Sequence, residues 1–406
     1  MLQAGVGFSP QQDTQKAAVE ATRIALQRAG CATADFALVF ATTGHGPGYS
    51  LLLRTIQLTT QATHVVGCSA GGVLTTDGEV ERAPGVAVLV VRSDTVTASR
   101  FFLPQLRGRG YETGKEIAAF AQSRLGPDNL LTIFPDTYNF NAAAFFNGLS
   151  EGAPNLPTVG GGASEDGSLG ETFQLCGDAV GNNAVSGLLL SGRFQATISN
   201  AQACQPIGPV HTVTKAQQNL LLELDGRPAF EVFAEVVRQP LIDDLRRAAA
   251  FVFVGLPVDP ERRQVDRGEY VVRNIIGFDP AQGIIAVADE IHQGQKMIFT
   301  LRDGSGARED LKGMLEALAR TWEGNPPGFG MYFNCLGRGA GLYGFPDLDV
   351  SYIRQYFGDM PLIGFFTGCE IAPIRQHVAL HQYSGVLVLV GEDKSRISPG
   401  RVQDSR

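Results

Sequence analysis

The most reactive group of side chains in the sequence follows an apolar run of strand type. Asn334 and Cys335 place an amide and a thiol at the end of this run, and Gly337 and Gly339 flank Arg338. Ligands of α/β proteins bind beside the carboxyl ends of strands, where glycines let backbone N–H groups approach closely. The guanidinium of Arg338 offers a planar fork for a carboxylate or a phosphate. These five residues therefore form a candidate ligand-binding loop.

A second loop carries the opposite charge. Thr367 and Glu370 follow another apolar run, with Gly368 between them. If the two loops are neighbours, as a β–α–β unit implies, Arg338 and Glu370 face one pocket and suit the two ends of an amino-acid-like molecule. The alternative is a structural ion pair between Arg338 and Glu370 that closes the end of the sheet, since structural pairs perturb charged groups as binding sites do. The residues alone leave both interpretations open.

Cys335 is also a candidate nucleophile. A catalytic thiol needs a base and a lowered pKa, and none of the six histidines lies in a motif with Cys335. A single cysteine at a strand end more often acts as a small buried apolar residue. We therefore predict no catalytic residue, and keep thiol chemistry at Cys335 as an alternative.

The glycine-rich stretch GGGASEDG, residues 160–167, is a third candidate loop. Its backbone N–H groups can cradle an anion, and Gly161 and Gly162 belong to the predicted ligand site. No Gly-Lys-Ser/Thr follows, and its acidic residues oppose phosphate. A Gly-x-Ser-x-Gly spacing occurs at residues 67–71, but a nucleophile elbow continues into a helix, and here the next residues predict loop and turn. These features argue against a nucleotide-binding loop and against a serine hydrolase.

The sequence predicts no metal site and no cofactor. His377 and His381 are four residues apart, but their surroundings predict a strand, and no glutamate lies between them. The six cysteines are scattered and form no Cys-x-x-Cys pair. This usage is typical of reduced thiols in the cytoplasm.

A repeated element positions the candidate loops. Apolar strands run into a glycine at Val65–Gly67, Thr158–Gly160 and Leu362–Gly364, and each is followed by another apolar strand that begins near a glycine. Self-similarity of this kind indicates a repeat, and a weaker fourth copy is predicted within residues 275–287. We predict an α/β fold with layers of sheet and helix, built from β-α-β-β units in two pseudo-similar halves. The polar, proline-containing stretch near residues 200–218 is the predicted boundary.

The clearest helix signal lies near the N-terminus. Ser9 is a suitable N-cap, Pro10 suits the first helical position, and the amphipathic run that follows ends at Gly30. A helix is therefore predicted between these residues.

Composition excludes several classes of protein. With 406 residues, 44% hydrophobic and 18% charged, the chain can form a large core. No apolar run reaches the roughly 18 residues of a membrane-spanning helix, and the N-terminus lacks a signal-peptide pattern. A net charge of −8 without a basic stripe argues against nucleic acid as a partner. We therefore expect a cytoplasmic protein that binds neither membrane nor nucleic acid.

Several motifs together resemble those of the FIST family. They are VVGCSAGGVL, VGGGASEDG and AVSGLLLSG in the first half, and LDGRPAFEVF, NCLGRGAGLYG, PLIGFFTGCEIAP and HQYSGVLVLV in the second. The resemblance implies a FIST N-terminal domain at residues 30–205 and a FIST C-terminal domain at residues 215–392. One departure is Cys369, because family members usually have glycine directly before the glutamate of the second loop.

The resemblance implies a sensory module of signal transduction that binds a small molecule, with amino acids as the proposed class. Such a module acts through a separate signalling protein, which is the second expected partner. We place this function in the third copy of the repeat and interpret the first two copies as mainly architectural. The alternative function is a thiol-dependent transferase or hydrolase that uses Cys335.

Overall fold

The described residues contain three copies of one α/β unit and one inserted domain. The computed structural model describes residues 1–259 and 268–393. In each unit an edge strand and a helix precede two parallel strands that are joined by one or two helices, and a hairpin and a return strand follow. The predicted α/β class and the predicted repetition of a strand–helix–strand element are confirmed.

Units 1 and 2 follow each other directly along the chain. Unit 1 consists of β1 (Leu2–Ser9), α1 (Thr14–Ala29), β2 (Phe36–Thr42), a 3₁₀ turn (Thr43–Gly48), α2 (Tyr49–Thr60), β3 (His64–Ala70), β4 (Gly72–Thr75), β5 (Gly78–Glu81) and β6 (Val86–Ser93). Unit 2 consists of β7 (Val96–Pro104), α3 (Gly110–Gln122), β8 (Asp128–Pro135), α4 (Ala142–Gly152), β9 (Thr158–Gly161), β10 (Gln174–Cys176), β11 (Ala179–Gly181) and β12 (Ala184–Gly192). In both units the return strand pairs with the edge strand and with the first parallel strand.

Unit 3 has the same order of elements, but the inserted domain interrupts it after its edge strand. Unit 3 consists of β13 (Gln195–Gln202), α7 (Gly304–Thr321), β21 (Phe329–Cys335), α8 (Gly339–Tyr343), α9 (Leu348–Phe357), β22 (Leu362–Thr367), β23 (Glu370–Ile374), β24 (His377–His381) and β25 (Ser384–Gly391). The insertion consists of β14 (Cys204–Gln217), β15 (Leu220–Leu224), β16 (Arg227–Pro228), α5 (Ala229–Val236), a 3₁₀ turn (Leu241–Asp243), α6 (Leu245–Phe251), β17 (Val252–Pro257), β18 (Tyr270–Asp279), β19 (Ile284–Val287) and β20 (Lys296–Arg302). The first half of the chain thus holds two units, and the second holds the insertion and most of unit 3.

The three units exchange hairpins in a cycle. Each six-stranded sheet contains four strands of one unit and two of another, in the orders β1-β6-β2-β3-β10-β11, β7-β12-β8-β9-β23-β24 and β13-β25-β21-β22-β4-β5. Unit 1 donates β4–β5 to the sheet of unit 3, unit 2 donates β10–β11 to unit 1, and unit 3 donates β23–β24 to unit 2. Each sheet is therefore completed by a different unit.

The repeated glycines are explained by the contact between parallel strands. Gly67, Gly160 and Gly364 occupy the same register position in the three parallel pairs. A Cβ atom at any of them would collide with the carbonyl oxygen of the paired residue on the neighbouring strand. No side chain fits at this position, which is why each copy has a glycine there.

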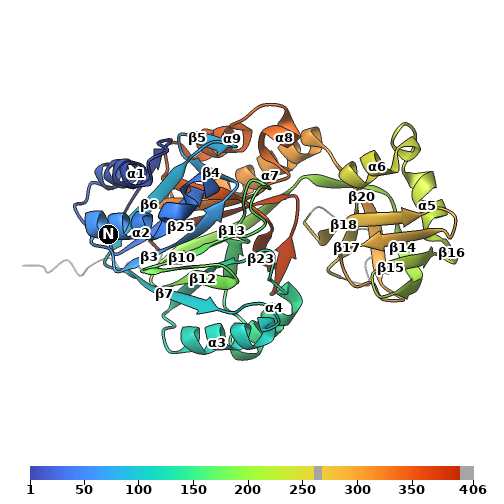
Figure 1. Cartoon of the computed structure of the whole chain (residues 1–406), viewed down its shortest axis with the longest axis horizontal. Helices are drawn as coiled ribbons and strands as arrows, with labels where there is room; N and C mark the ends of the chain where they lie inside the picture. Colours follow the sequence, from blue (N-terminus) through green and yellow to red (C-terminus); the bar gives the residue numbers. More distant parts are fainter. Residues whose placement is uncertain (260–267, 394–406) are drawn as a thin grey trace, which may run out of the picture.

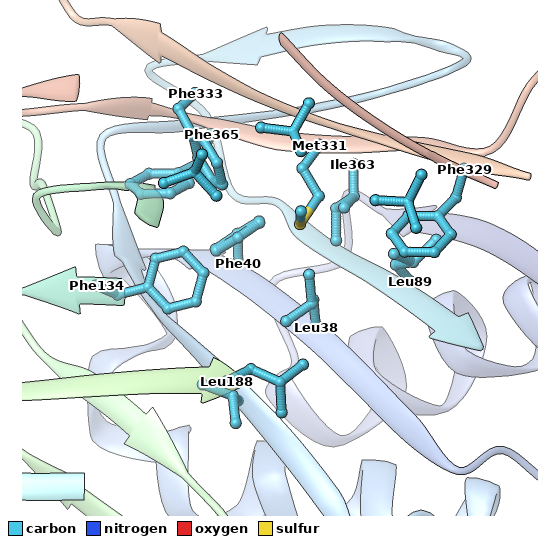
Figure 2. Packing of buried hydrophobic residues seen from close by; sticks show 14 of the residues in the cluster. Leu38, Phe40, Leu89, Phe134, Leu188, Phe329, Met331, Phe333, Ile363 and Phe365 are labelled. Carbon is cyan, nitrogen blue, oxygen red and sulfur yellow. The ribbon is translucent and has the colours of Figure 1, made fainter. Parts of the chain in front are cut away.

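Three equivalent phenylalanines meet in the central core (Figure 2). Phe40, Phe134 and Phe333 each lie one residue after the partner of the repeated glycine. The ring centroids of Phe40 and Phe134 are 5.3 Å apart, those of Phe134 and Phe333 are 6.1 Å apart, and Phe365 contacts all three rings. Tilted and edge-to-face pairs of this kind add to the stabilisation by burial. The units therefore share one core around a pseudo-threefold axis.

Helices cover the outer faces of the three sheets: α1 and α2 in unit 1, α3 and α4 in unit 2, α7 and α9 in unit 3. Helix α1 ends at Gly30, as predicted, and this glycine adopts a left-handed φ of 66°. The predicted N-cap is wrong, because Ser9 belongs to β1 and Asp13 accepts the capping hydrogen bond instead. Within the described ranges, no helix is long and apolar enough to span a membrane.

The insertion is a small antiparallel barrel that forms a lobe beside the three units (Figure 1). Its strands pair in the order β14-β20-β17-β18-β19-β15, and pairing of β15 with β14 closes the ring. The fourth copy predicted within residues 275–287 is wrong, because these residues form β18 and β19, which pair antiparallel. The predicted boundary near residues 200–218 falls mostly on β14, which leads from unit 3 into the barrel. The predicted domain limits, 30–205 and 215–392, stay a prediction.

Candidate functional site

A pocket of about 410 Å³ lies at the carboxyl ends of the parallel strands, where the three units meet. Gly71, Ser164 and Gly368 all contact it, and each lies four residues after the repeated glycine of its unit. We call this the axis pocket. It is lined by Gly71, Glu81 and Arg82 of unit 1, by Thr137, Tyr138, residues 163–167 and Thr172 of unit 2, and by Leu336, Phe366 and Gly368 of unit 3. Unit 2 contributes most of the wall, and the strand-end position is where α/β sheets bind ligands.

The hydroxyl of Ser164 joins the three units at the base of this pocket. Its Oγ accepts a hydrogen bond from the Gly71 N–H at 2.9 Å and donates one to the carbonyl oxygen of Phe366. The Ser164 N–H donates to the Ser69 carbonyl at 3.1 Å, and the Ser69 hydroxyl donates back to the Ser164 carbonyl at 3.0 Å. Both serines are buried, so their hydroxyls act as fixed links. Ser69 lies inside β3 and is saturated, which agrees with the argument against a serine hydrolase.

Two ionised carboxylates border the axis pocket. Burial opposes ionisation of Glu165, but hydrogen bonds from the Leu169 N–H, the Tyr138 hydroxyl and the Gly167 N–H outweigh it and lower its pKa. The hydroxyl and N–H of Ser168 lower the pKa of Asp166. Both side chains are therefore negatively charged near neutral pH.

Arg82 places a positive charge at the same pocket. Its side chain is exposed, and no hydrogen bond or ion pair connects it to another residue of the described ranges. Its backbone φ of 56° is left-handed, which is uncommon for a residue other than glycine and often occurs at functional sites. Leu336, Phe366 and Tyr138 add apolar surface, and Tyr138 is 56% exposed. The axis pocket thus combines a cation that has no ion-pair partner among the described residues with three acidic side chains, Glu81, Glu165 and Asp166, and an apolar wall.

Arg338 lies outside the axis pocket in a buried ion pair. Its Nε and Nη2 donate to the two carboxylate oxygens of Asp349, both at 3.1 Å, and its remaining contacts are the Tyr343 hydroxyl and the Ala201 carbonyl. The side chains of Arg338 and Asp349 are fully buried. A ligand anion would have to displace Asp349 to reach the guanidinium.

The structure separates Arg338 from Glu370. Asp349 also accepts a hydrogen bond from the Tyr332 hydroxyl, whereas Glu370 interacts with the Cys335 thiol. Side chains alternate along a strand, so Tyr332 and Cys335 point to opposite faces of β21. The structure therefore supports neither the shared pocket nor the direct ion pair that the sequence suggested for Arg338 and Glu370.

Glu370 is fully buried, and within the described ranges it forms no ion pair. Its Oε1 accepts a hydrogen bond from the Thr367 hydroxyl at 2.6 Å, and its Oε2 accepts from the N–H and the hydroxyl of Ser384 at 3.1 and 2.8 Å. Burial raises the pKa of Glu370 to about 7, although the hydrogen bonds from Thr367, Ser384 and Cys335 oppose the shift. The carboxyl group can therefore titrate near neutral pH.

Cys335 is an unreactive thiol in this environment. Burial and the neighbouring Glu370 raise its pKa, and only 7% of the residue is exposed. Its Sγ accepts hydrogen bonds from the N–H groups of Gly337 and Tyr383. A nucleophilic thiolate needs the opposite environment, so the geometry gives no support to thiol catalysis.

The other residues of the predicted site fall into two groups. Gly161 pairs with Glu370 across β9 and β23, and a Cβ atom at Gly161 would collide with the side chain of Thr367. Gly162 packs in the same way against Thr137, which lines the axis pocket. Gly161, Gly162, Thr367, Cys335 and Glu370 are therefore brought together beside the axis pocket.

Asn334 lies on the face of β21 opposite Cys335, and Gly339 begins α8 directly after Arg338. Asn334 is fully buried, and neither atom of its amide has a partner in the described chain. Gly339 has a left-handed φ of 57°, and a Cβ atom there would crowd the Glu81 carboxylate, which accepts the Ala340 N–H. These positions shape the loop around the Arg338–Asp349 pair.

Sequence reasoning missed the charged residues of the axis pocket. Glu165 and Asp166 were seen only as obstacles to phosphate, and Arg82 lies in a turn without a motif. Aligning the three copies on their repeated glycines would have placed Gly71, Ser164 and Gly368 at one level. Among the described residues, no group of three or more His, Cys, Asp and Glu side chains could hold a metal ion.

Family models match most of the chain: the FIST N domain at residues 35–227 and the FIST C domain at residues 229–373. The chain belongs to the FIST family. FIST domains are associated with sensing in signal transduction. The axis pocket contains residues matched by both models, so in this FIST protein it spans the two family domains.

Relatives of this FIST protein extend over almost its whole length. An uncharacterized protein of Mycobacterium tuberculosis is 29% identical over 96% of this chain and 99% of the relative. An uncharacterized protein of Mycobacterium bovis is also 29% identical, over 97% of this chain and 100% of the relative. The solved structure of a cyanuric acid hydrolase aligns with 97% of this chain and 100% of its own chain, at 8% sequence identity and a TM-score of 0.35. The solved structure of a chorismatase aligns with 96% of this chain and 99% of its own chain, at 10% identity and a TM-score of 0.34. These two likenesses are too weak to support an inference about function.

Proposed function

We propose that this FIST protein binds a small zwitterionic, amino-acid-like molecule in the axis pocket, and that this binding is its sensory event. The observation that carries the proposal is the combination, around one cavity, of Arg82, which forms no ion pair within the described part of the chain, with ionised Glu165 and Asp166. A guanidinium suits a ligand carboxylate, and the carboxylates suit a ligand ammonium group. These residues replace Arg338 and Glu370 in the role proposed from the sequence.

Ligand binding at this position can change the contacts between units. The pocket wall comes from all three units, and Ser164 links them through hydrogen bonds to Gly71 and Phe366. A ligand that prefers one arrangement of these loops shifts the population of the protein toward it. We propose that a separate signalling protein in the cytoplasm reads this shift.

Thermal-shift screening with free amino acids and related zwitterions tests the proposal. A ligand at a hundredfold excess over its Kd should stabilise the protein by about 2.7 kcal/mol. Arg82→Ala should abolish the shift, because it removes the cation that meets the ligand carboxylate, and Asp166→Asn should reduce it, because only Glu165 of the two carboxylates then faces the ligand ammonium group. Arg193→Ala is the matched control, since Arg193 is an exposed arginine between β12 and β13 that lies outside the pocket.

Two results would contradict this function. One is the absence of a shift with any charged small molecule at millimolar concentration. The other is a shift that survives in both pocket variants and is lost in Arg193→Ala, because that outcome would place the ligand elsewhere.

A further inference from the structure

The turn between β22 and β23 connects the axis pocket to a buried carboxyl group. Gly368 lines the pocket, and two residues later Glu370 begins β23. The Gly368 N–H donates to the Gly162 carbonyl at 3.0 Å, and the Gly162 N–H donates to the Cys369 carbonyl at 2.8 Å. Here the chain leaves the sheet of unit 3 and enters that of unit 2, so a change in this turn moves the pocket wall.

The described residues around Glu370 include several titratable groups but no ion-pair partner. They are Cys335 on β21, Cys369 in the turn, His381 on β24, Tyr383 before β25 and Cys204 at the start of β14. Burial raises the pKa values of the three thiols and of the Tyr383 hydroxyl, and lowers that of His381 to about 4. All of these groups are therefore uncharged near neutral pH.

The nearby cations serve other groups. Arg273 acts on Cys369 and His381 through space, and its side chain pairs with Asp289. Arg338 and Arg302 act on Cys204, and Arg338 is held by Asp349. Among the described residues, none of these arginines forms an ion pair with Glu370.

The hydrogen bonds of Glu370 differ between its two protonation states. The ionised carboxylate accepts from every donor around it, including the backbone N–H of Ser384, which cannot turn away. In the neutral acid the proton must therefore sit on Oε1, opposite the Thr367 hydroxyl that donates to this atom. Two hydrogens cannot share this contact, so the Thr367 hydroxyl has to rotate and accept instead. Thr367 is the last residue of β22 and the first of the turn.

We propose that loss and gain of a proton at Glu370 switches the turn at residues 367–370 between two hydrogen-bonded arrangements and so sets the shape of the axis pocket. This inference rests on the proposed function only for its consequence, regulation of ligand binding. The switch itself exists in the ligand-free protein. The switch acts in the neutral pH range, where a cell can vary its internal pH.

Hydrogen exchange of the ligand-free protein tests the switch. Peptides that cover residues 366–371 are compared at about pH 5.5 and about pH 8.5, after correction for the intrinsic pH dependence of exchange. The wild type should differ by roughly threefold or more in protection between the two conditions. Glu370→Gln should show the same protection at both, because the amide keeps the size of the acid and does not titrate.

Glu79→Gln is the matched control. Glu79 is a second buried acid whose pKa burial raises, to about 8, but it belongs to β5, and its carboxylate accepts from the N–H groups of Asp347 and Val350 at the start of α9. This variant should keep the wild-type response of residues 366–371. The proposal would be overturned if the pH dependence of protection at residues 366–371 disappeared in Glu79→Gln and persisted in Glu370→Gln. It would also be overturned if the wild type showed no pH dependence there.

Infrared spectroscopy gives an independent readout if Glu370→Gln does not fold. In the Glu79→Gln background, which removes the other buried carboxyl group with a raised pKa, the carbonyl stretch of the neutral Glu370 carboxyl should disappear as the pH rises through the neutral range. In Thr367→Val the midpoint should move to higher pH, because the ionised form loses one donor. An unchanged midpoint in Thr367→Val would contradict the assigned hydrogen-bond exchange, whatever ligand the pocket binds.

Discussion

Units 2 and 3 place a buried carboxylate near the same pocket in two different ways. In unit 2, Asp136 directly follows β8 and accepts hydrogen bonds from Tyr138 N–H, Thr172 hydroxyl, Asn139 amide and Asn183 N–H at 2.6–3.0 Å. In unit 3 the position equivalent to Asp136 is Cys335, and the carboxylate has moved to Glu370 on the donated hairpin.

The two carboxylates differ in the source of their hydrogen-bond donors. The donors around Asp136 come from the backbone and side chains of its own unit, so its contacts form part of the architecture. Glu370 has no exposed surface, its donors come from the Thr367 and Ser384 hydroxyls, the Ser384 N–H and the Cys335 thiol, and burial raises its pKa to about 7. The same fold thus holds two buried carboxylates with different surroundings, and burial brings the pKa of Glu370 into the neutral range.

The largest expected effect comes from the ion pair that holds the loop of unit 3. Arg338→Ala leaves the Asp349 carboxylate buried without its partner, which should lower the free energy of unfolding by about 3–5 kcal/mol. Chemical denaturation measures this loss. The double variant Arg338→Met with Asp349→Leu should recover much of it, and failure to recover would mean that the pair acts through more than its charges.

Glu370 should make the stability of the protein depend on pH with an unusual sign. Burial raises its pKa in the folded state to about 7, above the ordinary value of 4.5, so the folded state binds more protons between these values. The free energy of unfolding should therefore fall as the pH rises from about 4.5 to about 7, by at most about 3 kcal/mol, and stay constant above. Denaturation of wild type and Glu370→Gln across this range measures the contribution.

Two other groups must be separated from this effect. Glu79 acts in the same direction, because burial raises its pKa to about 8. His381 acts in the opposite direction, because burial lowers its pKa from 6.5 to about 4, so it adds stability as the pH rises between these values. If Glu370→Gln and wild type have parallel profiles, Glu370 does not titrate in this range.

Asp136→Asn tests the other half of the comparison. An amide nitrogen would face donors that now meet a carboxylate oxygen, so the variant should lose about 1–3 kcal/mol. Denaturation at one neutral pH is sufficient to measure it. If the free energy of unfolding is unchanged or higher in Asp136→Asn, the hydrogen bonds to the Asp136 carboxylate do not contribute to stability.

The smallest expected effect is at Ser164, where units 1 and 3 have glycine. Ser164→Ala removes the hydroxyl that joins Gly71 and Phe366 and should cost roughly 1–2 kcal/mol. Ser164→Gly also makes the position identical to its two equivalents and adds backbone freedom in the unfolded chain. Equal stability of wild type and both variants would mean that the hydroxyl does not hold the units together.

The repeat could be predicted from the sequence because it depends on a local steric rule. Gly67, Gly160 and Gly364 each face a carbonyl oxygen on the neighbouring strand, so the glycine is required wherever the unit occurs. The end of α1 at Gly30 is predictable for a similar local reason. Helices, strands and the α/β class follow from such rules.

The site could not be located from the sequence because its contacts are not local. Arg338 looked available, but its partner Asp349 lies on a helix whose orientation the sequence does not reveal. The wall around Glu165 is completed by residues near Arg82 and Leu336, which come from other units. The third copy has the most polar loop, yet the second copy contributes most of the axis pocket, because pocket position depends on how the units assemble.

The cyclic exchange of hairpins has a consequence for any attempt to divide the protein. A fragment that ends after β12 would contain β4–β5 without the sheet that receives them, and its own second sheet would lack β23–β24. In the remaining fragment, the sheet of unit 3 would lack β4–β5, and β23–β24 would lack the sheet that receives them. Such pieces resemble the two parts of a split reporter: each alone exposes unpaired strand edges, and together they should reassemble without a covalent link. The two parts of the chain are therefore held together more by the exchanged hairpins β4–β5 and β23–β24 than by the peptide bond between them.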